Sequence, residues 1–448
     1  MKIKSLFMML GICAAVVGCS EEGTRTGAGM GDGLEVKEER KSVTVAVMSS
    51  NRFLEAAERQ FEAEHPEVDI VIKEYMALPK VGEGQAQIAP SQADLEKYIQ
   101  TMTTQAIAGE GMDVISLNAL PVEQYIEKNV LVDLQAWMDK DSSFDSSVYY
   151  ERIFESMKTG DELYQLPLGF YLEGIISANS DLLREANLTI DDRTWTWEQF
   201  KDLSKRLQEK VGSDVMAFAN MLPFQLLYET IEANYGDLVQ GKKAYFDSDL
   251  FRDMMRHIKS MYDEGVLSTE YTQDWSKTLF TSYALASPQS AVMEMAKPNV
   301  QFLLKPTIKG NSEGASYSAD STFGINRGSK VQPEAWEFLK FLLSEEMQSS
   351  PELHTYPVHK KAVDHKLTDA LASLEKGDVP GGVPNPEVFE KRKQMLKSFL
   401  EQAGSSNRGD IKIISIIEEE FAAYISGQKS AEEVSELIQN RVTTYLNE

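Results

Sequence analysis

The two cysteines are the residues of this sequence with the most restricted chemistry. Lys2 and Lys4 give a positive start, and residues 6–18 are uncharged and mostly apolar up to Cys19. That order is typical of a secretory signal. Residues 16–19, Val-Val-Gly-Cys, resemble the bacterial lipobox, where a peptidase cleaves before the cysteine and its thiol receives a diacylglycerol. We therefore predict a signal peptide at 1–18 and a lipidated Cys19.

Lipidation of Cys19 leaves the mature chain without a free thiol, because Cys13 lies inside the removed signal. Disulfides, thiol catalysis and thiolate metal sites are then excluded. No stretch of the chain approaches the roughly 20 apolar residues that a spanning helix needs. We expect the acyl chains to hold the protein at the extracytoplasmic face of the cell membrane.

Other sets of potentially reactive or metal-binding residues do not have the spacing that a metal site or a known catalytic motif requires. His354, His359 and His365 place no two imidazoles on one helical turn, so we predict no metal site there. The aspartates within 139–145 mimic part of a calcium loop but lack its glycine and closing glutamate. No nucleophile elbow, zinc-protease helix, phosphate loop or dinucleotide fingerprint is present. We expect no cofactor.

Length and composition indicate how the part of the chain that carries any site is organised. The 448 residues are 42% hydrophobic, and a body of about 400 residues exceeds one core, so two lobes are expected. The formal charge is 45 minus 70, or -25, which repels nucleic acid. Residues 19–41 are polar and rich in glycine, so we predict a flexible tether.

The first half of the body alternates strand and helix patterns. Strands are predicted at 43–48, 68–75 and 114–117, with amphipathic helices between them. This order implies a parallel sheet whose strand-end loops share one edge. Asn51 and Asn118 fall on that edge as candidate ligand contacts, and hydrogen bonding within local turns is the alternative. The second half is richer in helix.

Several segments in fixed order resemble the family 1 extracellular solute-binding proteins, the maltose-binding-protein-like sugar-capturing lipoproteins of ABC importers. The pieces that carry this resemblance are residues 61–69, 112–117, 163–169, 195–203, 335–347 and 357–361. The resemblance implies a two-lobed α/β fold of the periplasmic-binding-protein type II class. Each lobe is a mixed sheet flanked by helices, and the ligand cleft lies between the lobes.

The resemblance also implies boundaries and partners. Lobe 1 is placed at 42–167 plus 290–326, and lobe 2 at 168–289 plus 327–448. The implied function is capture of a sugar or oligosaccharide by a monomer, which delivers it to a membrane permease with a separate ATPase.

Sugar sites pair aromatic platforms with planar amides and carboxylates, because sugars present apolar faces ringed by hydroxyls. Trp275, in a polar loop, is the first candidate platform, and a structural tryptophan is the alternative. Phe170 and Tyr171 follow the first predicted crossing between lobes, and Glu173 is a candidate acceptor for sugar hydroxyls.

Two other functions remain open at this point. A lipid-anchored glycoside hydrolase would need two carboxylates about 5 to 10 Å apart, and spacing in sequence cannot show such a pair. An extracellular scaffold protein is the other alternative. Release of product from a chromogenic glycoside panel would favour the hydrolase, and saturable binding without turnover would favour the receptor.

Overall fold

The computed structural model describes residues 40–76, 91–109, 111–218, 221–270, 275–282, 285–310, 314–377, 385–405 and 409–447. The predicted signal peptide and Cys19, together with most of the predicted tether, lie outside these residues. None of the helices within the described ranges has the length and apolar content needed to cross a membrane.

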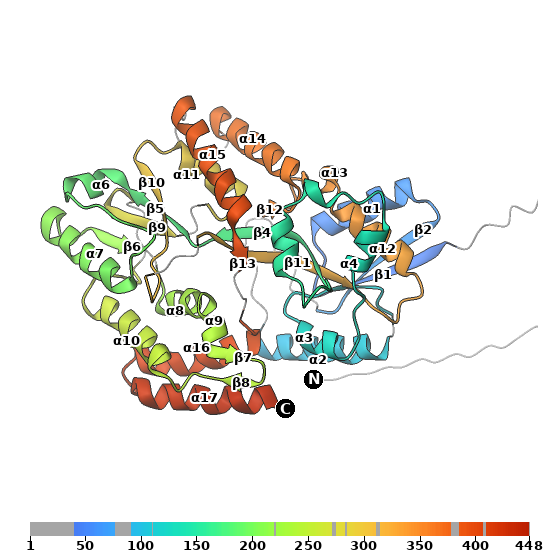
Figure 1. The fold of residues 1–448 in the computed structure, drawn as a ribbon, viewed down its shortest axis with the longest axis horizontal. Coiled ribbons are helices and arrows are strands. Elements are labelled where there is room, and N and C mark those ends of the chain that lie inside the picture. Colours follow the sequence, from blue (N-terminus) through green and yellow to red (C-terminus); the bar gives the residue numbers. More distant parts are fainter. Residues whose placement is uncertain are drawn as a thin grey trace, which may run out of the picture. The chain divides into compact units, whose positions relative to one another are not determined.

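The larger sheet holds the three predicted N-terminal strands and four later ones (Figure 1). Its strand order is β12-β4-β11-β3-β1-β2, and β13 pairs with β11. Strands β1, β2 and β3 are parallel, whereas β11 runs antiparallel to both β3 and β4. The bounds are β1 Lys41–Val47, β2 Val68–Glu74, β3 Val114–Ser116, β4 Leu166–Glu173, β11 Ser316–Ile325, β12 Tyr356–Pro357 and β13 Gly404–Ser405.

The second sheet has four strands in the order β10-β5-β9-β6. Strand β5 pairs antiparallel with β9 and β10, and β6 pairs parallel with β9, so this sheet is also mixed. The bounds are β5 Ile175–Asn179, β6 Met216–Phe218, β9 Thr278–Ser282 and β10 Val300–Leu304, with a separate hairpin of β7 Val239–Gln240 and β8 Lys243–Ala244.

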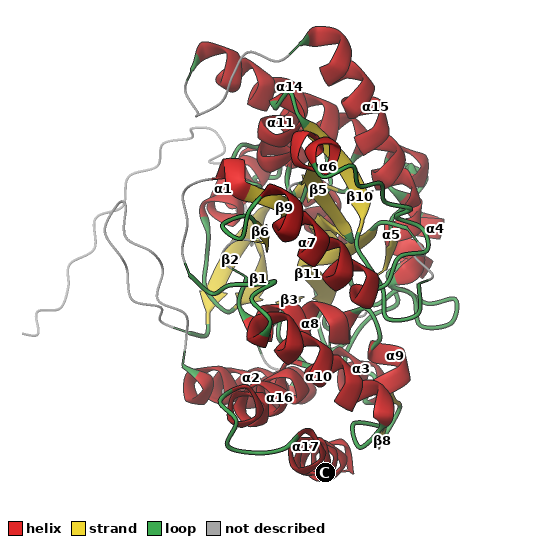
Figure 2. Ribbon diagram, turned by 90° about the vertical axis from the view of Figure 1, so that its left-hand side faces the viewer, coloured by secondary structure: helices red, strands yellow, loops and turns green. Residues whose placement is uncertain are grey.

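Helices flank both sheets, and Figure 2 shows strands between α11, α14 and α15 on one side and α2, α16 and α17 on the other. The helices that pack with the first sheet are α1 Arg52–Glu64, α2 Gln92–Ala108, α3 Val122–Glu127, α4 Gln135–Lys140, α5 Glu151–Ser156, α11 Pro288–Ala296, α12 Gln332–Leu342, α13 Glu345–Gln348, α14 Lys360–Lys376 and α15 Pro386–Gln402. Those that pack with the second are α6 Ser180–Glu185, α7 Trp197–Val211, α8 Pro223–Glu232, α9 Tyr235–Leu238, α10 Asp249–Asp263, α16 Ile411–Ile425 and α17 Ala431–Asn447. Short 3-10 turns span Ser146–Val148 and Trp275–Lys277.

Two large hydrophobic cores correspond to the two sheets, except that Ile175 of β5 and Phe302 and Leu304 of β10 belong to the first core. A further cluster lies on the α2 side of the first sheet. The predicted lobe boundaries differ from these cores in two places. Pro167 lies inside the first sheet, paired with Thr322, and the chain leaves that sheet only at Gly174. Buried residues of 335–403 belong to the first core, although we placed this stretch in lobe 2. Whether the two cores move as separate lobes remains a prediction.

Candidate functional site

The crossing between the two sheets is built around Gly174, which follows β4 directly and precedes β5. Its φ of 75° is left-handed, a conformation that glycine adopts without steric cost. The backbone N–H of Lys305, just after β10, donates to the Gly174 carbonyl at 2.8 Å. Strands β4 and β10 of the two sheets therefore meet at this point.

One face of β4 and β11 is polar beside this crossing. Successive side chains of a strand point to opposite faces, and the leucines of β4 fill the first core. The alternate positions carry Gly169, Tyr171 and Glu173, and their partners on β11 are Asp320, Ser318 and Ser316. Tyr171 keeps 37% of its surface exposed, so the polar face offers an accessible ring beside a carboxylate.

Phe170 does not belong to this accessible face, contrary to our expectation. Its ring is fully buried, stacks on Tyr356 at 5.6 Å between centroids, and makes edge contacts with Tyr150 and Tyr317. The cause is the alternation of the strand, since neighbours such as Phe170 and Tyr171 must face opposite sides. We therefore do not carry Phe170 into the proposed site.

A second polar group comes from α8 and the end of β10, and sequence reasoning missed it. Lys305 Nζ lies 2.9 Å from Glu229 Oε2, with side chains only 15% and 10% exposed. The Tyr228 hydroxyl donates to Glu232 Oε1 at 2.5 Å, and Glu232 is 8% exposed. Buried charges are rare unless paired. The sequence signal that could have revealed this group is Glu232, which lies among the buried leucines and isoleucine of α8.

The two predicted asparagines lie at the expected sheet edge, because β1 and β3 are parallel neighbours. Asn51 caps α1 by accepting from the backbone N–H of Leu54 at 2.9 Å. Asn118 Oδ1 accepts from the backbone N–H of Thr322 at 2.8 Å. Each carbonyl oxygen thus binds the protein itself, and direct ligand contact by either residue remains a prediction.

Trp275 begins the short turn that leads into β9. Its side chain lies outside the described part of the structure, so its role as a platform also remains a prediction. Among the described residues, no group of three or more histidines, cysteines, aspartates or glutamates is placed to hold a metal ion.

Two helix-flanked mixed sheets that meet at a polar, partly aromatic crossing define the periplasmic-binding-protein class of α/β proteins. The sequence matches the family described as "Bacterial extracellular solute-binding protein" over residues 49–349, and the chain belongs to that family. The resemblance noted from the sequence is thereby confirmed. The protein is a solute-binding protein and not an enzyme.

Solved structures share the fold at low sequence identity. An ABC substrate-binding protein from Listeria monocytogenes, in complex with cycloalternan, has a TM-score of 0.57 and 16% identity, covering 91% of this chain and 99% of that chain. The sugar-binding protein MalE from Xanthomonas citri has a TM-score of 0.60 and 16% identity, covering 91% and 98%. T. maritima MalE3, bound to maltose, has a TM-score of 0.54 and 17% identity, covering 90% and 99%.

Proposed function

We propose that the protein is the substrate-binding lipoprotein of an ABC importer, which captures a sugar or oligosaccharide between its two cores and delivers it to a membrane permease. The exposed ring of Tyr171 beside Glu173, at the crossing of the two sheets, is the observation that carries this proposal. The ligands of two similar structures, cycloalternan and maltose, support the sugar class.

The chemistry of the crossing supports a sugar better than an apolar or polyanionic ligand. Tyr171 offers a ring face, while Glu173 is a carboxylate that accepts hydrogen bonds from hydroxyls. Lys305 connects the buried Glu229 to the crossing. The overall formal charge of -25 disfavours a polyanion.

Thermal shift against a panel of neutral oligosaccharides tests the function. A sugar at 100 times its dissociation constant should raise the free energy of unfolding by about 2.7 kcal/mol. Tyr171→Ala should then weaken binding of that sugar by about 1 to 3 kcal/mol. Tyr245→Ala is the matched control, because Tyr245 is 40% exposed in the loop after β8. Equal affinity of the two variants would remove Tyr171 from the site.

Trp275 stays in the proposal as a second platform. Stacking on a sugar predicts that Trp275→Ala weakens binding by about 1 to 3 kcal/mol with the urea midpoint nearly unchanged. A core tryptophan would instead cost about 3 to 5 kcal/mol of stability at constant affinity. Calorimetry and urea unfolding on one preparation separate these results.

A further inference from the structure

Strand β11 runs unbroken from Ser316 to Ile325, but one residue in its middle, next to the proposed site, has an irregular backbone. Its register with β4 is continuous from Ser316 to Phe323 except that Ser321 pairs with nothing there. Ser321 has a φ of 51°, in the left-handed region that a residue with a side chain rarely adopts. Residues 319–321 are partly exposed, whereas the flanking strand residues are buried. Such backbone strain persists only where the surrounding structure enforces it.

Asn118, just after β3, holds the backbone next to Ser321 in place. Its Oδ1 accepts from both the backbone N–H of Thr322, at 2.8 Å, and the Thr322 hydroxyl, at 3.4 Å. The next residue, Ala119, is also left-handed, with a φ of 64°. Two strained residues therefore lie on either side of one asparagine clamp, which fixes the backbone directly after Ser321.

Asp320 directly precedes this irregular residue and keeps part of its surface exposed, and the Ser321 hydroxyl donates to its Oδ2 at 3.0 Å. Asp320 pairs with Gly169, which has no side chain. A Cβ at Gly169 would lie 2.1 Å from the hydroxyl oxygen of Thr355, so only glycine admits Thr355 here. Thr355 is 2% exposed, and its Oγ1 has no hydrogen-bond partner among the described residues. A buried hydroxyl normally has such a partner.

We propose that Asp320, on the same face as Tyr171, is a specificity-determining acceptor for ligand hydroxyl groups, and that Asn118 is a positioning residue which holds the backbone of β11 in the conformation that presents Asp320. This inference rests on the proposed function, because the crossing must bind a hydroxyl-bearing ligand. It also reassigns Asn118, whose carbonyl oxygen acts on the protein and not on the ligand. The Asp320 carboxylate is acceptor-only, which suits a donor-rich sugar.

The test of Asp320 uses the tightest-binding member of a panel of glucose, maltose, maltotriose, cellobiose and xylobiose. Asp320→Asn keeps the shape but removes the charge, and we expect its dissociation constant to rise roughly tenfold to a hundredfold, as for loss of one charge-assisted hydrogen bond. Asp145→Asn is the matched control, since Ser147 donates to Asp145 as Ser321 donates to Asp320, and Asp145 caps the 3-10 turn Ser146–Val148. Unchanged affinity in Asp320→Asn would overturn the assignment.

The test of Asn118 compares alanine with aspartate. Asn118→Asp retains an oxygen for the Thr322 N–H and should bind close to wild type, whereas Asn118→Ala should bind several-fold more weakly. Hydrogen–deuterium exchange of the peptide containing Thr322, without any sugar, should be fast only in Asn118→Ala. Loss of affinity in both variants would overturn the positioning role, because the Asn118 amide group would then contact the ligand directly.

Failure of sugar binding and failure of the roles given to Asp320 and Asn118 would be distinguished by different results. If no panel sugar binds the wild-type protein, the proposed function fails for these sugars and the Asp320 assignment fails with it. The exchange comparison needs no ligand, so equal exchange of the Thr322 peptide in all three proteins would by itself refute the clamp.

Discussion

At the scale of single residues, Asp141 shows how local hydrogen bonds set a charge. Lys340 Nζ donates to its Oδ2 at 2.7 Å, Trp336 Nε1 donates to the same oxygen at 2.9 Å, and the Ser143 hydroxyl donates to Oδ1 at 2.6 Å. The hydrogen bond from Lys340, followed by those from Ser143 and Trp336, lowers the pKa of Asp141 well below its ordinary 3.8. The carboxylate joins α12 to the end of α4.

This depressed pKa makes a pH-dependent contribution to stability. A carboxylate with a lowered folded-state pKa stabilises the fold above its ordinary pKa, and the contribution is lost as pH falls through the folded-state value. We expect the free energy of unfolding of wild type to fall more steeply than that of Asp141→Asn below about pH 4. Urea midpoints measured at several pH values test this, with exposed Asp139→Asn as control. Parallel pH profiles would contradict it.

Individual residues also show what the sequence could predict. The capping pair Thr196 and Gln199 is confirmed by both reciprocal hydrogen bonds, because a cap depends on residues three apart. Leucines at alternate positions of β4 could likewise have assigned Phe170 to the core face. The Lys305 to Glu229 contact joins residues 76 positions apart, and no local pattern specifies such a pair.

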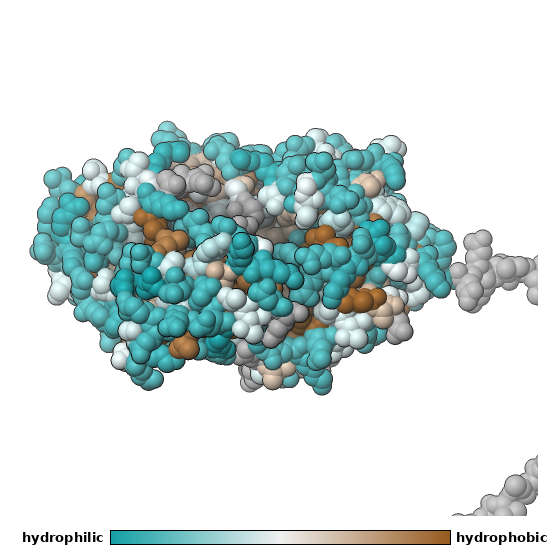
Figure 3. All heavy atoms as spheres, turned by 60° about the horizontal axis from the view of Figure 1, so that its bottom comes forward, coloured by the Kyte–Doolittle hydropathy of each residue, from teal (hydrophilic) through white to brown (hydrophobic). Residues whose placement is uncertain are grey.

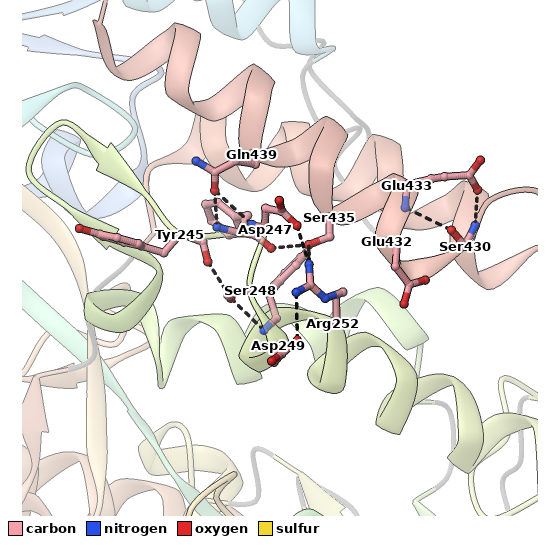
Figure 4. Close-up of polar contacts among 12 residues, drawn as sticks. Tyr245, Asp247, Ser248, Asp249, Arg252, Ser430, Glu432, Glu433, Ser435 and Gln439 are labelled. Atoms are coloured by element: carbon pink, nitrogen blue, oxygen red, sulfur yellow. Dashed lines mark hydrogen bonds and ion pairs between the residues drawn. The ribbon is translucent and has the colours of Figure 1, made fainter.

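At the scale of elements, Figure 4 shows how α17 holds the loop that precedes α10. Gln439 Oε1 accepts from the backbone N–H groups of Phe246 and Asp247 at 2.7 and 3.1 Å, and its Nε2 donates to the Ala244 carbonyl at 2.9 Å. Ser435 donates to the Phe246 carbonyl. One glutamine therefore satisfies three backbone groups, one at the end of β8 and two in the loop that follows it.

Replacing this glutamine should destabilise the junction of α10 and α17. We expect Gln439→Leu to lower the free energy of unfolding by about 2 kcal/mol, because the partly buried backbone groups lose their partners. The control is Glu436→Leu, an exposed position of the same helix. Urea unfolding of the full chain measures both variants. Equal midpoints for Gln439→Leu and Glu436→Leu would mean that water replaces the hydrogen bonds of Gln439 without loss of stability.

The order and type of the helices and strands could be predicted from the sequence better than the core against which each one packs. Periodicity located the three parallel strands correctly, since a change of period is a local signal. It could not show that the helices of 332–402 pack on the first core, because an amphipathic helix fits either sheet equally well. Assigning a helix to a core requires contacts between distant segments.

At the scale of the whole molecule, the question is how the protein attaches to the membrane, and both the surface and Cys19 bear on it. The face drawn in Figure 3 is mostly hydrophilic, with small separate apolar patches. The lipobox-like residues 16–19 support our proposal that acyl chains on Cys19 attach the protein to the membrane. Cys19→Ala should give a folded protein that enters the aqueous phase in detergent phase separation, while wild type enters the detergent phase. Detergent partitioning of Cys19→Ala would place the attachment elsewhere.

We expect the two cores to move relative to each other about the crossing at Gly174. A ligand that contacts both cores binds best when they close on it, so binding selects the closed arrangement. Small-angle scattering should give a smaller radius of gyration when a sugar identified by thermal shift is added. Tyr171→Ala, at a sugar concentration that only partly saturates it, should show a smaller decrease. An unchanged radius despite proven binding would mean that the pocket is preformed within one core, and the predicted two-lobe motion would then be wrong.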